Sequence, residues 1–428
     1  MRLHPSLSMV AAAIAMLTAT TVQFGAIPSA NAHGGGFGVH GHRIKAPPPV
    51  KAPPVDNVRD FGATGNGVTD DTTAIQNTAN DAASKGKGVF FPAGTYLHAS
   101  PVTFNGVPVT GVGLGSVLIA NNPGNCAVIL TGFGPSIQNM VISTQGLAGG
   151  TSLLVPNTAT ILVQNATSFT VANDTIVAGP NAWPVLVLMS TVGTINSVVC
   201  DGTGNVNDIG VVIDQSNHVT IANCLFQNEA SGVAVLPNGG PSQSIAVLSN
   251  TVGNVTWPTT NIGIFAASVS ILDISQNTIQ MANSNVSIPI EVTDCNNFTV
   301  AANDTWGGLI GAEVFTPGSG NNFVTQNTMH NCGSEGIEVT TLASSAIHVT
   351  SNAFGECGLL VPSPVILVII AGPGAEASAA TTFIQNNSYQ GHLNLLNFLI
   401  VCGFGSAKIP PANVTGNTQT QTALSNFL

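Results

Sequence analysis

The sequence predicts an all-β protein folded as a single-stranded parallel β-helix, a solenoid of stacked coils. Three observations carry this prediction: a repeat of about 26 residues, short β-branched strands that begin with glycine, and a scarcity of charge. Only 6% of the 428 residues are charged, against about 25% in an ordinary soluble domain. Stacked parallel strands lie ~4.8 Å apart, and charges of one sign repel each other at that distance. A long β-helix therefore accounts for the composition.

The first 55 residues precede this domain. Residues 1–32 have the pattern of a secretory signal peptide, with Arg2 before an apolar run and Ala30-Asn31-Ala32 as a small-x-small cleavage site. Residues 33–55 are rich in Gly, His and Pro, a composition typical of a linker. We therefore expect a secreted protein, extracellular, periplasmic or on the cell surface, whose β-helix domain spans residues 56–428.

The segment 58–96 carries the most specific motif of the chain. It reads VRDFGA at 58–63, GNGVTDDT at 65–72 and GVFFPAGTY at 88–96. Apolar residues at helical spacing predict an amphipathic helix from Asp71 to Ser84 that covers the N-terminal end of the solenoid. Asp60 and Asp70 are expected, like Asp71, in caps and turns rather than in catalysis.

These motifs resemble the N-terminal signature of the pectate-lyase-like superfamily of right-handed parallel β-helix proteins. That superfamily includes polygalacturonase-like hydrolases, uronate epimerases and phage tailspikes. The resemblance implies a right-handed coil and an N-terminal cap over residues 56–97, but it does not choose a chemistry. A C-terminal cap is expected at about 381–428, because a terminal repeat must cover an exposed edge.

An asparagine marks each coil of the repeat. The positions are Asn173, Asn196, Asn223, Asn250, Asn277, Asn303, Asn327 and Asn352. Asn tolerates left-handed backbone geometry, and its amide can hydrogen-bond to the Asn of the next coil. We therefore expect Asn223, Asn250 and Asn277 to stack in register, in a structural role.

Each coil also contains a Gly-apolar-x-apolar strand whose x residue points outward. In three consecutive coils x is Glu291, Glu313 and Glu338, and Leu360 continues the pattern. The three carboxylates are expected in one column, with ~10 Å between the first and third Cα atoms. Three interpretations stay open: a solvated acidic strip, a glycoside hydrolase site with paired carboxylates, or a calcium site.

Two further glutamates are candidates by resemblance. Ser334-Glu335-Gly336-Ile337-Glu338 resembles the element of polygalacturonase-like hydrolases that contains a catalytic Asp, and Glu356 half-resembles the acid pair one coil later. The chain departs from that pattern at Cys357, and no Gly-His-Gly or Arg-Ile-Lys follows. The resemblance implies that Glu335 and Glu356 join Glu291, Glu313 and Glu338 as catalytic candidates.

Tryptophan and cysteine provide the remaining candidates. Trp183, Trp257 and Trp306 lie in turn-like stretches; packing is the favoured role of each, and an exposed ring that stacks on a sugar, as in substrate binding, is the alternative. Cys332 and Cys357 each follow their coil's Asn by five residues, so they are expected to stack, as a disulfide or as two buried thiols.

The charge distribution limits the partners. All Arg lie at or before Arg59, and after Lys87 the only cation is Lys408. Nucleic acid is therefore excluded, and no apolar run after the signal peptide is long enough to span a membrane. The favoured interpretation is a secreted, carbohydrate-active glycoside hydrolase, preferred over a polysaccharide lyase, that acts on an extracellular polysaccharide. The alternative is a non-catalytic β-helix that serves as a surface, adhesive or glycan-binding scaffold. No cofactor is expected, with calcium as the alternative, and the oligomeric state is left open.

Overall fold

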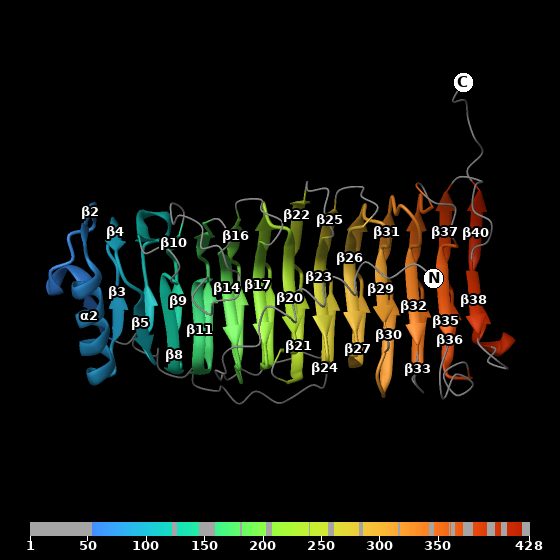
Figure 1. The fold of residues 1–428 in the computed structure, drawn as a ribbon, viewed down its shortest axis with the longest axis horizontal. Helices are drawn as coiled ribbons and strands as arrows, with labels where there is room; N and C mark the ends of the chain where they lie inside the picture. Colours follow the sequence, from blue (N-terminus) through green and yellow to red (C-terminus); the bar gives the residue numbers. More distant parts are fainter. Residues whose placement is uncertain are drawn as a thin grey trace, which may run out of the picture.

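The computed structural model describes residues 54–421 except 122–125, 145–158, 180–181, 203–207, 239, 256–260, 282–285, 316, 342–345, 359, 361–363, 371–379, 392–398 and 404–408. The expected signal peptide, nearly all of the expected linker, and Trp257 lie outside the described residues. The described chain forms a right-handed parallel β-helix, as the sequence predicts (Figure 1).

Three parallel sheets run along the solenoid, and from β5 onward each coil contributes one strand to each sheet; the strands before β5 belong to sheets B and C only. Sheet A has 12 strands: β5 (Val102–Asn105), β8 (Val128–Phe133), β11 (Ala159–Thr167), β14 (Trp183–Leu188), β17 (Ile209–Asp214), β20 (Ser231–Leu236), β23 (Ile262–Ala267), β26 (Ile288–Thr293), β29 (Ala312–Phe315), β32 (Ile337–Thr341), β35 (Ile366–Ile370) and β38 (Leu399–Gly403).

Sheet B follows sheet A in each coil and has 14 strands: β1 (Val55–Asn57), β3 (Gly88–Phe90), β6 (Pro108–Thr110), β9 (Ser136–Gln138), β12 (Phe169–Ala172), β15 (Gly193–Asn196), β18 (Asn217–Ala222), β21 (Ser242–Leu248), β24 (Val269–Ser275), β27 (Asn296–Ala301), β30 (Asn321–Thr325), β33 (Ala346–Thr350), β36 (Thr382–Gln385) and β39 (Val414–Thr415).

Sheet C closes the coil, also with 14 strands: β2 (Asn66–Asp70), β4 (Gly94–His98), β7 (Ser116–Ala120), β10 (Val141–Ser143), β13 (Thr175–Val177), β16 (Val199–Asp201), β19 (Leu225–Gln227), β22 (Thr251–Val255), β25 (Thr278–Met281), β28 (Asp304–Trp306), β31 (Thr328–His330), β34 (Ala353–Gly355), β37 (Ser388–Gly391) and β40 (Thr418–Gln421). Strands of the expected C-terminal segment thus continue all three sheets.

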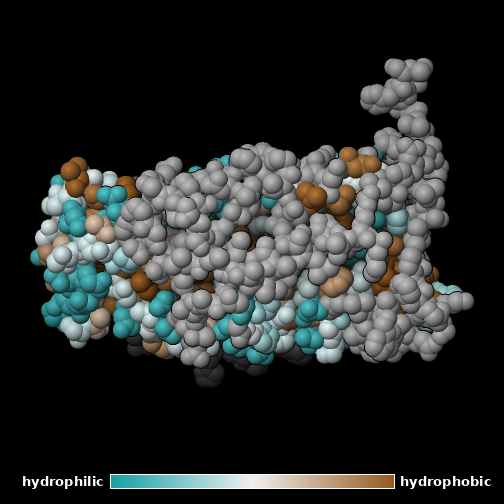
Figure 2. Space-filling view, in the orientation of Figure 1, coloured by the Kyte–Doolittle hydropathy of each residue, from teal (hydrophilic) through white to brown (hydrophobic). Residues whose placement is uncertain are grey.

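The helix α2 (Thr72–Lys85) lies at the N-terminal end of the solenoid, as the sequence predicts (Figure 1). It buries Ile75, Ala79 and Ala82 and packs against β1, β3 and β5. Polar residues gather on the outside of this end (Figure 2). Three 3₁₀ turns complete the described elements: η1 (Val58–Phe61), η2 (Gly113–Gly115) and η3 (Pro411–Asn413).

Two acids of the N-terminal motif hold this end together. The Asp71 carboxylate accepts hydrogen bonds from the backbone N–H groups of Thr64 (2.7 Å) and Gly65 (3.0 Å). Asp70 accepts hydrogen bonds from the hydroxyl and from the backbone N–H (3.0 Å) of Thr72. Both bonds lower the pKa of Asp70, and the bond from the hydroxyl is the larger cause. Asp70 therefore bonds the first residue of α2, whereas Asp71 stands at the N-cap position without a side-chain cap bond and fixes the preceding turn instead.

A buried column of asparagines links the coils of the C-terminal half. Its members are Asn250, Asn277, Asn303, Asn327, Asn352, Asn387 and Asn417. The Oδ1 of Asn277 accepts from both the backbone N–H (2.9 Å) and the Nδ2 (3.0 Å) of Asn250. The Nδ2 of Asn277 donates to Val247 O (2.8 Å) and to the Oδ1 of Asn303 (2.9 Å). Both polar atoms of the Asn277 side-chain amide therefore have hydrogen-bond partners, as a buried polar group requires. We call this column of asparagines the ladder.

In the coils before Asn250, the ladder position lies one residue later in the chain than the sequence predicts. Cys224, not Asn223, pairs with Asn250 across the rung, because Leu225 is in register with Thr251. Asn223 instead adopts φ 55, the left-handed geometry of the residue that precedes the ladder position. The predicted stacking of Asn223 with Asn250 and Asn277 is therefore wrong. Left-handed geometry and ladder bonding both favour Asn, but they belong to adjacent residues.

The repeated strand glycines are required by packing. A Cβ built on Gly336 would lie 2.3 Å from the ring of Phe354, a core residue of sheet C. The same construction at Gly210 meets Phe226 at 2.3 Å. The glycines therefore lie where sheet C turns into sheet A, and they make room for the core side chains of sheet C.

The two cysteines predicted to stack are neighbours and are fully buried free thiols. Burial raises the pKa of Cys357 well above its ordinary value, and the adjacent Cys332 thiol adds to this. Of the two alternatives, the structure contains the pair of thiols.

No helix among the described residues is both long and apolar enough to cross a membrane.

We expect Asp174→Asn to stabilise the protein at neutral pH. Asp174 occupies a ladder position: its Oδ1 accepts from Met140 N (2.9 Å), while its buried Oδ2 has no described hydrogen-bond partner. Desolvation raises its pKa to about 8. Because the folded pKa exceeds the unfolded one, stability falls as pH rises from about 4 to about 8. Asn supplies a neutral donor, so the gain in unfolding free energy should grow across that window, to at least ~1 kcal/mol at pH 7, as chemical denaturation at several pH values would measure.

The reverse substitution, Asn277→Asp, is the control for this effect. It should destabilise the protein increasingly over the same pH range. Equal pH profiles for wild type and Asp174→Asn would contradict the assignment of this carboxyl.

We expect Gly336→Ala to cost about 1–3 kcal/mol of unfolding free energy, because the added methyl collides with a packed ring. Gly253→Ala is the matched control, since its Cβ would meet nothing closer than 4.0 Å. Chemical denaturation of both variants tests the steric explanation, which an unchanged Gly336→Ala protein would refute.

Candidate functional site

Three glutamates of sheet A stand on consecutive rungs, as the sequence predicts. Glu291 of β26 pairs with Glu313 of β29, which pairs with Glu338 of β32. Strand alternation turns their neighbours into the core and the carboxylates outward. Adjacent rungs are ~4.8 Å apart, which puts the first and third Cα atoms ~10 Å from each other. We call these three residues the glutamate column.

The glutamate column is shielded from solvent, unlike a solvated strip. Glu291 and Glu313 are each 1% exposed and Glu338 is 8% exposed. The column ends at Phe265 on one side and Leu367 on the other. The expectation that Leu360 continues it is wrong, because the strand in register is β35 and Leu360 lies outside it, 49% exposed.

The two glutamates chosen by resemblance lie in different places. Glu335 lies two residues before the start of β32, is 8% exposed, and its carbonyl accepts from Gly311 N (3.1 Å). Glu356 follows β34 of sheet C in left-handed geometry (φ 53), and its N–H donates to Gln390 O (3.3 Å). Glu335 is thus close in sequence to the strand of Glu338, whereas Glu356 is not in register with the glutamate column.

The tryptophans differ in exposure. Trp183 begins β14 and is 6% exposed, which agrees with packing, the interpretation that the sequence favours, and not with an exposed platform. Trp306 ends β28 on the outer face of sheet C and is 40% exposed. Its ring stacks on His330 of β31, with 4.0 Å between centroids and 20° between planes. Trp306 therefore lies on a strand rather than in a turn.

A second group of acids was missed by the sequence reasoning. Glu229 is 1% exposed and neither carboxylate oxygen has a described hydrogen-bond partner. Desolvation raises its pKa well above the ordinary value, and the charges of Asp208 and Asp201 add to this. The signal was present: Asp208 and Glu229 shortly precede the strand glycines of their coils, as Glu335 precedes Gly336.

No cofactor is indicated. Among the described residues, no group of three or more His, Cys, Asp or Glu side chains is arranged to hold a metal ion.

Comparison with solved structures places the fold among polysaccharide-modifying and surface proteins. The A-module of the mannuronan C-5 epimerase AlgE6 from Azotobacter vinelandii is 16% identical, with a TM-score of 0.51, over 86% of this chain and 99% of that chain. The surface adhesin PfbA of Streptococcus pneumoniae is 14% identical, with a TM-score of 0.51, over 85% and 97%. At such identities the likeness concerns the fold alone.

Sequence comparison with curated proteins gives a local match and a family. The LysM effector LysM19 of Penicillium expansum, described as non-secreted, is 45% identical over 56 residues, 11% of this chain but only 4% of that protein. A family model described as rhamnogalacturonase A/epimerase, pectate lyase-like, matches residues 55–288, more than half of the chain. The chain therefore belongs to the rhamnogalacturonase A/epimerase, pectate lyase-like family.

Proposed function

We propose that this protein is a secreted glycoside hydrolase acting on an extracellular polysaccharide. The observation that carries the proposal is the register of Glu291, Glu313 and Glu338 on consecutive rungs. Glycoside hydrolysis needs two carboxyl groups, ~5 Å apart for retention or ~6.5–9.5 Å for inversion of configuration. In the glutamate column, residues one rung apart come close to the separation for retention, and residues two rungs apart come close to the separation for inversion.

The better catalytic pair joins Glu338, the more exposed end of the glutamate column, to Glu335, which lies outside the column and shortly before β32. Glu335 and Glu338 each retain 8% exposure, whereas Glu291 and Glu313 retain 1%. In the proposed reaction one carboxyl donates its proton to the glycosidic oxygen, and a neighbouring carboxylate activates water or attacks the sugar. Shielding from water strengthens such electrostatic interactions.

A lyase mechanism has less support. Elimination from a polyuronate needs a base and cations that hold the carboxylate of the substrate. The described residues include only three Lys or Arg, namely Arg59, Lys85 and Lys87, all at the N-terminal cap. Family membership alone does not decide between these chemistries.

A non-catalytic scaffold is the second candidate function. The observation in its favour is the burial of Glu291 and Glu313, which keeps these two carboxylates away from a ligand in this conformation. The fold likeness to PfbA is compatible with such a role.

We expect Glu338→Gln and Glu335→Gln each to lower the hydrolysis rate by about 10²-fold or more, because an amide is neither an acid nor a base. Reducing ends released from a panel of neutral and acidic polysaccharides would be measured, together with ultraviolet-absorbing unsaturated products.

Asp273→Asn on sheet B is the matched control and should keep full activity, with the melting temperature of every variant checked. Full activity of both Gln variants would contradict the site, and unsaturated products would contradict the hydrolase.

A further inference from the structure

A column of outward side chains on sheet C is interrupted by a glycine. Gln280, Trp306, His330, Gly355 and Gln390 occupy equivalent positions on five consecutive rungs. Gln280 and Gln390, at its ends, are exposed to solvent. This column is separate from the glutamate column, which belongs to sheet A.

The two rings in the column are held in place. The imidazole of His330 stacks on Trp306 on one side, at 4.0 Å between centroids. Its Nε2 also lies 3.4 Å from the Asp304 carboxylate. These two contacts orient the imidazole with its second face toward the next rung.

The next rung offers no side chain. A Cβ built on Gly355 would lie 3.3 Å from the His330 Nδ1 and 3.9 Å from Gln390 O. Apart from the chain neighbours of Gly355, no other described atom would lie within 4 Å of it. The backbone of Gly355 has no left-handed φ, so conformation does not demand glycine here. Two rungs, ~9.6 Å, separate the Cα atoms of His330 and Gln390. That separation leaves room for one ring about 3.5–4 Å thick against the imidazole.

We propose that the ring of a neutral sugar unit binds over Gly355, on the open face of His330. The apolar face of a pyranose stacks on the imidazole as it does on other aromatic rings, and the exposed Gln390 amide on the next rung bonds its hydroxyls. The polysaccharide nature of the ligand rests on the proposed function, and the Gly355 site defines its class as neutral.

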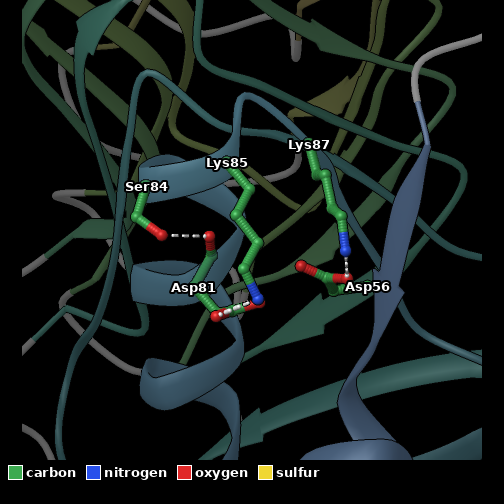
Figure 3. A network of polar contacts seen from close by, with 5 residues as sticks. All are labelled: Asp56, Asp81, Ser84, Lys85 and Lys87. Atoms are coloured by element: carbon green, nitrogen blue, oxygen red, sulfur yellow. Dashed lines mark hydrogen bonds and ion pairs between the residues drawn. The ribbon is translucent and has the colours of Figure 1, made fainter.

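Charge is the reason for choosing a neutral sugar over a uronate. Glu356 follows Gly355 in the chain, the Asp304 carboxylate lies 3.4 Å from the His330 imidazole, and the net charge of the chain is −11. The described cations are already engaged far away at the cap (Figure 1): Arg59 donates to Ala93 O (2.8 Å), and Lys85 and Lys87 pair with Asp81 (2.7 Å) and Asp56 (2.5 Å) (Figure 3). A polyuronate would add negative charge with no described cation to neutralise it.

The test is affinity electrophoresis of the purified mature protein in native gels. The gels contain galactomannan, xyloglucan, mixed-linkage β-glucan or dextran, or else polygalacturonate or alginate, all with EDTA. At least one neutral polysaccharide should retard the protein, and neither acidic one should.

The variant Gly355→Val places a side chain in the gap and suits a strand, so it should weaken binding at least tenfold. The control Ala353→Val, on the same strand and the same outer face, should change binding less than twofold.

The binding assay is repeated with Glu338→Gln, so that hydrolysis neither consumes nor conceals the ligand. Retention by no neutral polysaccharide, equal retention by an acidic one, or unchanged binding by Gly355→Val overturns the Gly355 site. Binding that depends on Gly355 in a protein without hydrolase activity supports this site and refutes the hydrolase alone.

Discussion

The axial register between coils is the constraint on which the rest of this structure depends. A shift of one residue in a parallel strand moves every side chain to the opposite face. In the C-terminal half, the ladder amides oppose such a shift, because Asn277 bonds to Asn250 and Asn303 at once. Leaving a buried amide unsatisfied would cost about 1–3 kcal/mol at each rung. The ladder therefore fixes which residues face outward.

The outward columns follow from that register. Glutamates that are far apart in sequence become neighbours on sheet A, and Trp306 and His330 become a stacked pair on sheet C. Stacking also explains the scarcity of charge, because each acid meets its counterparts one rung away. The glutamate column is an exception to this scarcity of charged residues, and such exceptions are expected at functional positions.

The sequence was sufficient for the fold, the N-terminal helix and the rungs of Glu291, Glu313 and Glu338, because each depends on periodicity. The sequence was insufficient where two different requirements, left-handed backbone geometry and ladder hydrogen bonding, both favour Asn. Asn223 satisfies left-handed geometry while Cys224 takes the ladder position, and composition does not separate these roles. Burial of the glutamate column also escaped prediction, since periodicity says which way a side chain points and not what covers it.

The amide ladder is unevenly distributed along the rod. Before Asn250 its positions are held by Cys224, Val198 and Met140, interrupted by Asp174. Apolar packing weakens on cooling, because its driving force is largely entropic near room temperature, whereas the amide half also rests on directional hydrogen bonds. One apolar core runs through both halves, so the coils from Asn250 onward have a contribution between coils that does not fade on cooling and that most of the earlier coils lack.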